Sequence, residues 1–280
     1  MKTTMYRKNL IAIAVGSLLS LGMATNAMAL PQFQVDPNMD NNHTDAFYAT
    51  SISGSSSERL TANVIDNTLV ATFGYLTFTG FTNDGPVGND VGPAFGSVFS
   101  TGINGDYQLY LTFNLVAKLT SGSLGGAGSQ YSLESLNFEV WRDNLSTLTN
   151  FTAATVGAEA AVTGNGDDIK LGSGSLIFGS AALTNGVFGS TVGAALNSKT
   201  TYTNTTDGDK YFFDPSPFYN ISFNAFNNTG TGVTSDGTHI AINSAAGVVD
   251  FNRVPEPETL ALMGIGLLGL GVSLRKRKAA

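Results

Sequence analysis

The segment Tyr107-Gln-Leu-Tyr-Leu-Thr-Phe-Asn-Leu-Val-Ala-Lys-Leu119 carries an apolar residue at every odd position. Successive side chains of a β-strand point to opposite faces of a sheet, so one face of this segment is continuously apolar. A helix would instead repeat its apolar residues every three or four positions. The segment therefore predicts a half-buried β-strand.

Segments of similar character lie on both sides of it. In residues 136–141, Leu136, Phe138 and Val140 share one face, opposite Asn137, Glu139 and Trp141. Further strand patterns occupy residues 70–78, 219–225 and 248–251. Clusters of turn-forming residues separate the strands, at 82–86, 104–106, 121–129, 163–167 and 206–209.

Short strands divided by such turns predict an all-β fold, as an antiparallel sandwich or barrel. Of these we expect an antiparallel β-sandwich or jelly-roll-like body. Helical periodicity is almost absent, and only residues 156–162 and 191–197 could each form a short helical turn.

Composition narrows the possible functions. Residues 30–253 contain seven Lys and Arg against 19 Asp and Glu, which gives this part a net charge of about −12. Such a surface repels nucleic acid, so we expect no nucleic-acid partner. The chain has no cysteine, which excludes disulfides, thiolate nucleophiles and cysteine-based metal sites.

The sequence offers few candidate catalytic groups. His43 and His239 are the only histidines, and neither accompanies a nucleophile motif such as G-x-S-x-G. Paired carboxylates could support glycoside hydrolysis, but Glu134 and Glu139 would lie on opposite faces of a continuous strand. We therefore predict that the protein is not an enzyme and has no catalytic residues. A polysaccharide-acting hydrolase on a β-sandwich remains the alternative.

Two weaker ligand hypotheses concern loops and a single ring. Calcium prefers hard oxygen ligands, and carboxylates suited to it lie in predicted turns at Asp84, Asp90, Asp167, Asp168, Asp207 and Asp209. None of these groups fits a known calcium-loop pattern, and no cofactor is otherwise predicted. A calcium-dependent self-assembling coat protein is thus a further alternative. Trp141 lies opposite Phe138 and Val140 by parity, which makes it the candidate carbohydrate contact.

The N-terminus predicts export. Lys2, Arg7 and Lys8 precede an apolar stretch, and Ala27-Met28-Ala29 follows as a small-residue cleavage site. This order is typical of a secretory signal peptide, here residues 1–29. It implies the Sec translocon and signal peptidase as partners, and residues 30–253 as the exported all-β domain.

The C-terminus predicts a membrane helix with a basic end. Residues 259–274 contain no charge, and as a helix they would span about 24 Å. The cations that follow can extend to the lipid headgroups and mark the cytoplasmic side, namely Arg275, Lys276, Arg277 and Lys278. We expect this helix to hold the exported domain at the inner membrane.

Residues 254–280 as a whole resemble the PEP-CTERM sorting signal of Gram-negative bacteria. Its three parts stand in order: the motif Val254-Pro255-Glu256-Pro257, an apolar helix at 259–274 and a basic tail at 275–278. The resemblance implies processing near the motif by a membrane enzyme, an exosortase. It also implies a cell that makes exopolysaccharide.

Several segments of the exported domain resemble one subgroup, the flocculation-associated (PepA-like) PEP-CTERM proteins. They are residues 33–37, 168–176, 217–223 and 249–253, and they occur in the order expected for that subgroup. The resemblance implies a surface or extracellular-matrix protein, anchored only transiently, that promotes floc or biofilm formation together with exopolysaccharide.

Overall fold

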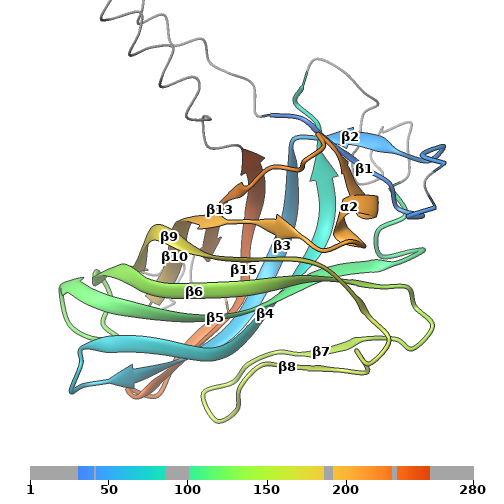
Figure 1. Cartoon of the computed structure of the whole chain (residues 1–280). Coiled ribbons are helices and arrows are strands. Elements are labelled where there is room, and N and C mark those ends of the chain that lie inside the picture. The colour runs from blue at the N-terminus through green and yellow to red at the C-terminus, as the bar shows by residue number, and fades with distance from the viewer. Residues whose placement is uncertain (1–30, 41, 86–100, 186–191, 229–231, 253–280) are drawn as a thin grey trace, which may run out of the picture.

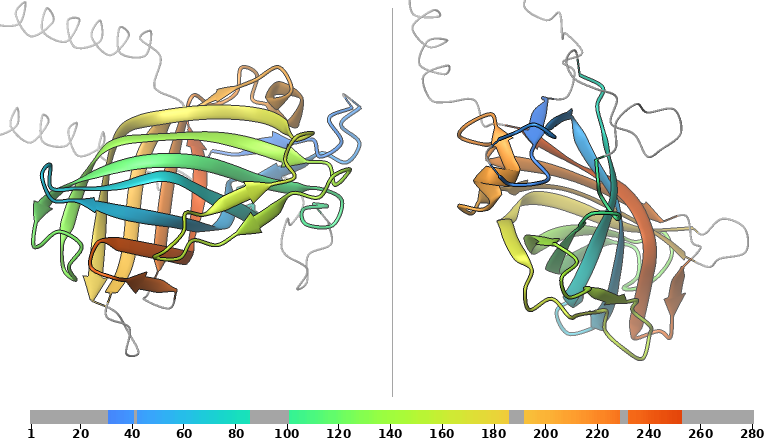
Figure 2. Two further views of the ribbon diagram at one scale, coloured as in Figure 1. Left: turned by 90° about the horizontal axis from the view of Figure 1, so that it is seen from below. Right: turned by 90° about the vertical axis from the view of Figure 1, so that its right-hand side faces the viewer.

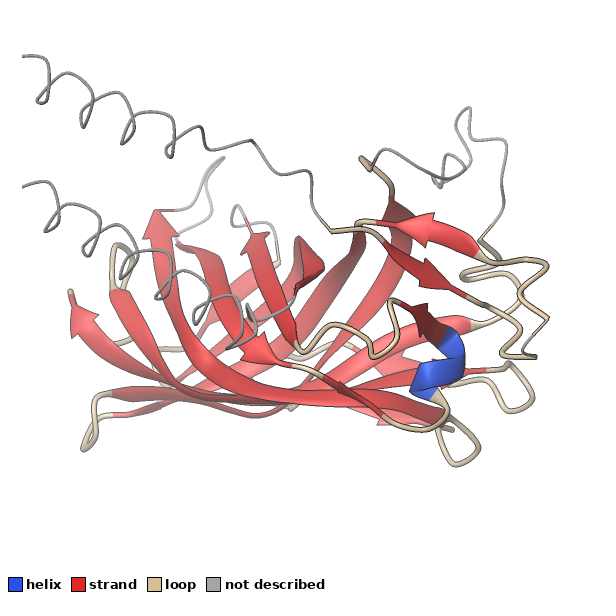
Figure 3. Ribbon diagram, turned by 45° about the horizontal axis from the view of Figure 1, so that its top comes forward, coloured by secondary structure: helices blue, strands red, loops and turns tan. Residues whose placement is uncertain are grey.

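The computed structural model describes residues 31–40, 42–85, 101–185, 192–228 and 232–252. Within these residues strands dominate, and α2 (Gly208–Tyr211) is the one α-helix (Figures 1 and 3). The prediction of an all-β fold is confirmed.

Eight long strands form a closed antiparallel barrel (Figure 2). Each strand pairs with the next of the eight, and the last pairs with the first. The eight are β3 (Ser51–Asn63), β4 (Thr68–Thr82), β5 (Gln108–Ser121), β6 (Gln130–Asp143), β9 (Ile169–Asn185), β10 (Val192–Thr201), β13 (Ile221–Asn228) and β15 (His239–Asn252). This is an up-and-down topology, in which closure pairs both edges of the sheet.

The barrel stands in place of the expected β-sandwich or jelly-roll-like body. A strand in either architecture has one buried face, so an alternating sequence fits both. The difference lies in the pairing of β15 with β3, which joins segments far apart in the chain. The short helical turns expected at 156–162 and 191–197 are also wrong. Strand β8 (Ala161–Thr163) ends the first segment, and β10 takes up the second from Val192 onward.

Long excursions gather at one end of the barrel, which we call the capped end. There β1 (Phe33–Val35), β2 (Phe47–Ala49) and β12 (Phe212–Asp214) form a small antiparallel sheet beside α2 (Figure 1). The short strand β11 (Thr203–Asn204) pairs with β9 nearby. At the opposite end the described connections are turns and the short strand β14 (Val233–Ser235), which pairs with β15.

Another excursion packs against the outer wall. It contains β7 (Asn150–Thr152) and β8, which form a hairpin. The Ala154 N–H donates to Ser57 Oγ at 2.9 Å, and Asn243 Nδ2 donates to the Ala154 carbonyl at 2.9 Å. This hairpin buries outward-facing side chains of the barrel that would otherwise meet solvent.

Two clusters of buried apolar side chains fill the barrel. The cluster at the capped end is rich in aromatic rings and includes Phe33, Phe78, Tyr202, Phe212, Phe218 and Phe251. The cluster in the other half is largely aliphatic and includes Leu60, Leu69, Leu115, Leu133, Leu183 and Ile242. The interior therefore has an aromatic half and an aliphatic half.

Both predicted targeting segments, residues 1–29 and 254–280, lie outside the described residues, and so does the predicted helix at 259–274. Among the residues that are described, no helix combines the length and the apolar character needed to cross a membrane.

Candidate functional site

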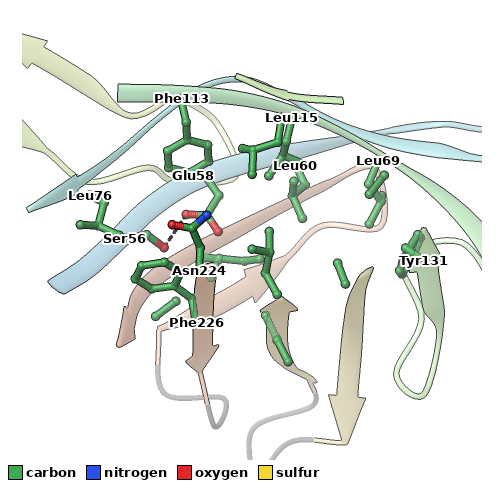
Figure 4. Close-up of a pocket in the computed structure, with 18 of the residues that line it drawn as sticks. Ser56, Glu58, Leu60, Leu69, Leu76, Phe113, Leu115, Tyr131, Asn224 and Phe226 are labelled. Carbon is green, nitrogen blue, oxygen red and sulfur yellow. Dashed lines mark hydrogen bonds between the residues drawn. The ribbon is translucent and has the colours of Figure 1, made fainter. Parts of the chain in front are cut away.

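The aliphatic half of the barrel contains a cavity of about 90 Å³, lined by side chains from all eight barrel strands (Figure 4). An eight-stranded barrel has an interior that side chains can just fill, or that can hold one small ligand. Here the filling is incomplete, and the cavity is the candidate binding site of the protein.

Short side chains explain why space remains. The sequence Ala181-Ala182-Leu183 in β9 pairs in register with Ala194-Ala195-Leu196 in β10, running in the opposite direction. All six residues line the cavity. A methyl group reaches only a short way from the wall, and the neighbouring strands do not move in to compensate because pairing fixes their positions.

Glu58 places a carboxyl group in this apolar cavity. Its side chain is 8 % exposed, and Ser56 Oγ donates a hydrogen bond to Oε2 at 2.8 Å. Burial raises the pKa of Glu58 to about 7, and the Ser56 hydrogen bond opposes part of that rise. Of the described residues that line the cavity, none carries a positive charge. The carboxyl group therefore lacks a charge partner.

Asn224 adds a second polar group to the cavity wall from strand β13. Its Nδ2 donates to Ser198 Oγ at 3.2 Å and to Thr200 Oγ1 at 3.4 Å. Thr200 Oγ1 in turn lies 2.6 Å from Ser222 Oγ. A short ladder of polar side chains thus crosses from β10 to β13 inside the barrel.

This ladder reverses the usual polarity of a barrel strand. In β13, Ser222 and Asn224 are buried inside, whereas Phe223 and Ala225 are exposed outside. The usual pattern places apolar residues toward the core. Strands that depart from it are expected at functional or strained sites.

The outward side chains of the same region form what we call the outer aromatic row: Phe178, Lys199 and Phe223. Phe178 and Phe223 are 62 % and 39 % exposed. Lys199 lies between them in register, with Nζ 5.9 Å from the Phe178 ring centroid and 5.4 Å from that of Phe223. These distances allow a cation–π contact with each ring.

A β-bulge helps to build the row. Lys199 pairs with Phe178 but Thr200 pairs with Leu176, so Ile177 is an extra residue in β9. A bulge changes the direction in which the neighbouring side chains point. Ile177 and Phe178 are both exposed, although consecutive residues of a regular strand point to opposite faces. In the sequence this bulge corresponds to three apolar residues in succession, Leu176 to Phe178, but that run does not show which strands will lie beside it.

The predicted carbohydrate contact, Trp141, lies at a different place. It is partly buried on the outer side of β6, and Lys170 Nζ is 6.0 Å from its ring centroid. Lys170 also forms an ion pair with Glu139 at 2.5 Å. Trp141 is thus less exposed than either ring of the outer aromatic row.

The two strand carboxylates are not arranged as the spacing predicted. Val116 pairs with Ser135 and Ala117 pairs with Leu133, so Glu134 is an extra residue at a bulge in β6. The expectation of opposite faces is therefore wrong, because the strand is not continuous. Glu134 is exposed and Glu139 is 46 % exposed, both on the outer side.

Three of the six predicted calcium ligands already have protein partners. Asp168 accepts hydrogen bonds from Tyr110 and Thr149. In the loop around α2, Asp207 pairs with Lys210 and Asp209 accepts from Asn204. Asp84 and Asp167 lie elsewhere in loops, and Asp90 is outside the described residues. Nowhere in the described part of the chain do three or more His, Asp or Glu side chains gather as metal ligands.

Each histidine pairs with an aspartate of its own loop. His43 Nδ1 lies 2.8 Å from Asp36 Oδ2, and its ring stacks on Phe213 with centroids 4.0 Å apart. Asp36 also accepts hydrogen bonds from two backbone N–H groups, which fixes the loop after β1. His239 Nδ1 lies 3.1 Å from Asp236 Oδ2 in the turn before β15.

Comparison with known proteins identifies one segment. A family model described as the PEP-CTERM protein-sorting motif matches residues 253–278. No curated protein and no solved structure matches the chain. The matched segment includes the predicted motif at Val254–Pro257 and the basic tail at Arg275–Lys278. The chain thus carries the signal of an exported protein that is sorted by an exosortase to the cell surface or beyond.

Proposed function

We propose that the barrel is a non-enzymatic protein of the cell surface or extracellular matrix, which promotes floc or biofilm formation by adhering to exopolysaccharide. The sorting motif at residues 253–278 supports the location. The ordered resemblance of the barrel sequence to flocculation-associated proteins supports the role.

On this proposal the chain follows a defined route out of a Gram-negative cell. The Sec translocon exports it, and signal peptidase cuts after Ala29. The helix at 259–274 then holds the barrel at the inner membrane until the exosortase acts near Val254–Pro257.

The outer aromatic row is the observation that carries the polysaccharide contact. Aromatic rings offer large and rigid apolar faces, on which the C–H faces of a sugar ring can stack. Phe178 and Phe223 remain exposed although most apolar side chains of the barrel are covered. Lys199 adds three hydrogen-bond donors for sugar hydroxyl or carboxylate groups.

Sedimentation of the purified protein with the cells' own exopolysaccharide tests this contact. Changing Phe178→Ala together with Phe223→Ala should weaken binding by about thirtyfold, since each of the two stacked rings contributes on the order of 1 kcal/mol. The matched control is Val64→Ala with Ile65→Ala, which removes two apolar side chains that are 76 % and 87 % exposed in a turn.

Four results distinguish these hypotheses. Loss of binding in the ring variant alone supports the proposal, and loss only with Trp141→Ala would move the contact to β6. Unchanged binding in both variants would contradict a polysaccharide contact through either surface. New reducing ends in the mixture would contradict a non-enzymatic role and favour a hydrolase.

Mass spectrometry of the mature C-terminus tests the route. We expect a matrix-associated product that ends near Pro257 and lacks residues 260–280. An intact tail confined to the inner membrane would instead describe an anchored protein, and the proposed extracellular role would lose its basis.

A further inference from the structure

We propose that the barrel cavity binds a small apolar molecule with one hydrogen-bond donor, such as a short aliphatic alcohol or amine, and that Glu58 accepts the hydrogen bond of that donor. This inference does not depend on adhesion to polysaccharide, because the cavity and the outer aromatic row lie on opposite faces of the sheet.

Size and lining favour a small apolar ligand. A water molecule needs roughly 10–15 Å³ of such space, so a cavity of about 90 Å³ has room for roughly five to eight non-hydrogen atoms. Its walls are mostly aliphatic, with Leu60, Leu69, Leu115 and Ile242 among them. Such apolar walls favour small apolar molecules.

The chemistry of Glu58 selects the polar end of the ligand. Ser56 donates to Oε2, and no described residue donates a hydrogen bond to Oε1. A donor on the ligand, O–H or N–H, would complete this carboxyl group. A ligand carboxylate would meet a like charge and be excluded.

The neighbourhood contains no competing charge. Glu58 and Tyr131 are the titratable side chains among the described residues that line the cavity. The Tyr131 hydroxyl already accepts hydrogen bonds from the Gly125 N–H and from Ser129 Oγ. Glu58 is therefore the one carboxyl group among the described residues that line the cavity, and the one that can accept a hydrogen bond as a charged group.

The presence of Glu58 at this place is itself informative. A carboxyl group in an apolar wall destabilises the fold, and a Gln or Leu side chain could occupy the same space. The alanine pairs of β9 and β10 likewise leave space that larger side chains could fill. The buried carboxyl group and the unfilled space both destabilise the fold, and they occur at one site. A binding site requires such features, whereas a barrel with a purely structural role would avoid them.

The test uses protein purified from the producing cells, with 1-hexanol, hexylamine and hexanoate as probes. Saturation-transfer NMR and the shift in melting temperature report binding. We expect hexanol and hexylamine to bind and hexanoate to bind at least about tenfold more weakly above neutral pH. If none of the three binds up to millimolar concentration, the site does not exist.

Two variants and one control assign the contacts. Glu58→Gln should weaken hexylamine by about tenfold and abolish the discrimination against hexanoate. Ala194→Leu should reduce binding of all probes, because it fills the cavity. The control Glu134→Gln changes an exposed carboxylate on the same barrel and should leave every affinity unchanged. Equal binding of the three probes to all four proteins would overturn the role of Glu58.

Discussion

In the capped half of the barrel, aromatic rings meet edge to face across the interior, whereas in the other half short aliphatic side chains surround a cavity. Phe251 contacts Phe33, Tyr202 and Phe218 at centroid distances of 5.3, 4.8 and 5.2 Å. Among the described residues of the aliphatic half no such network is found, and alanines take up part of its wall.

The two halves differ because different segments of the chain supply the side chains that fill them. Phe33 belongs to β1 and Phe212 to β12, so these rings come from the cap rather than from the barrel strands. The described connections at the opposite end include the turns at 64–67 and 122–129. The eight strands thus enclose an interior that the cap fills at one end only. The aromatic half contributes the tighter packing, and the aliphatic half contains the cavity proposed to bind a ligand.

Phe251→Ala should have the largest effect on stability. It removes a ring packed against four others, those of Phe33, Tyr202, Phe212 and Phe218. Phe→Ala changes in well-packed cores cost about 3–5 kcal/mol. Leu115→Ala in the aliphatic half should cost less, about 2–3 kcal/mol, because Leu115 borders empty space. Urea denaturation of both variants measures the two free energies. Equal losses would mean that the cavity is closed in solution and that the halves pack alike.

Glu58→Gln should stabilise the protein in a pH-dependent way. The pKa of Glu58 is about 7 in the folded protein against 4.5 for the ordinary group. Between these pH values the folded state keeps a proton that the unfolded chain has released, so the free energy of unfolding falls as pH rises. Above about pH 8 the Gln variant should be more stable by about 3 kcal/mol, and below pH 4.5 the two proteins should be nearly equal.

Urea denaturation at pH 4.5 and at about pH 8 measures this difference. Glu134→Gln is the control, because it makes the same change at an exposed carboxylate of the same barrel. A Gln variant that is destabilised at high pH would show that the ionised Glu58 has a partner in the folded protein.

Ala194→Leu should stabilise the aliphatic half. The added side chain enters existing space, and cavity filling commonly contributes about 1 kcal/mol. Ala225→Leu on the outer side of β13 is the control, with an expected change near zero. Thermal unfolding measures both. A destabilised Ala194→Leu would indicate that the wall cannot accept the volume, as in an overpacked core.

The sequence predicted the strands whose two faces differ in polarity. Leu136, Phe138 and Val140 are buried in β6 while Asn137 is exposed, as their alternation indicated. It did not predict β3, which begins Ser-Ile-Ser-Gly-Ser-Ser-Ser-Glu. The inner face of that strand holds Ser56 and Glu58, and the β7–β8 hairpin covers Ser57 on its outer face. Neither face is therefore apolar enough to give the alternation of apolar and polar residues that is typical of a half-buried strand.

The cavity and the outer aromatic row were also beyond sequence reasoning, for a related reason. Both depend on which strands become neighbours, and the pairing of β10 with β13 brings Lys199 to Phe223 and Ser198 toward Asn224. The alternation in 219–225 predicted a strand there, but it does not show that Ser222 and Asn224 are buried while Phe223 is exposed. Only the sorting motif, whose parts are contiguous, could be recognised without the fold.

Tyr202→Phe should give the smallest change, a gain of about 1 kcal/mol in the aromatic half. The Tyr202 hydroxyl is buried and has no hydrogen-bond partner among the described residues. Removing an unsatisfied buried hydroxyl while keeping the ring relieves its desolvation cost. Tyr211→Phe is the matched change with the opposite sign, because the Tyr211 hydroxyl donates to the Tyr107 hydroxyl at 3.0 Å.

Thermal unfolding of the two variants measures how much a buried hydroxyl group without a partner destabilises the capped half, for comparison with Glu58 in the other half. A gain for Tyr202→Phe, together with a loss of about 1 kcal/mol for Tyr211→Phe, would show that the capped half gains from fewer open polar groups. Glu58 would then be the polar group whose cost is retained for binding. A loss on Tyr202→Phe would instead indicate that this hydroxyl is bonded in the folded protein, for example to a buried water molecule, and the contrast between the halves would rest on packing alone.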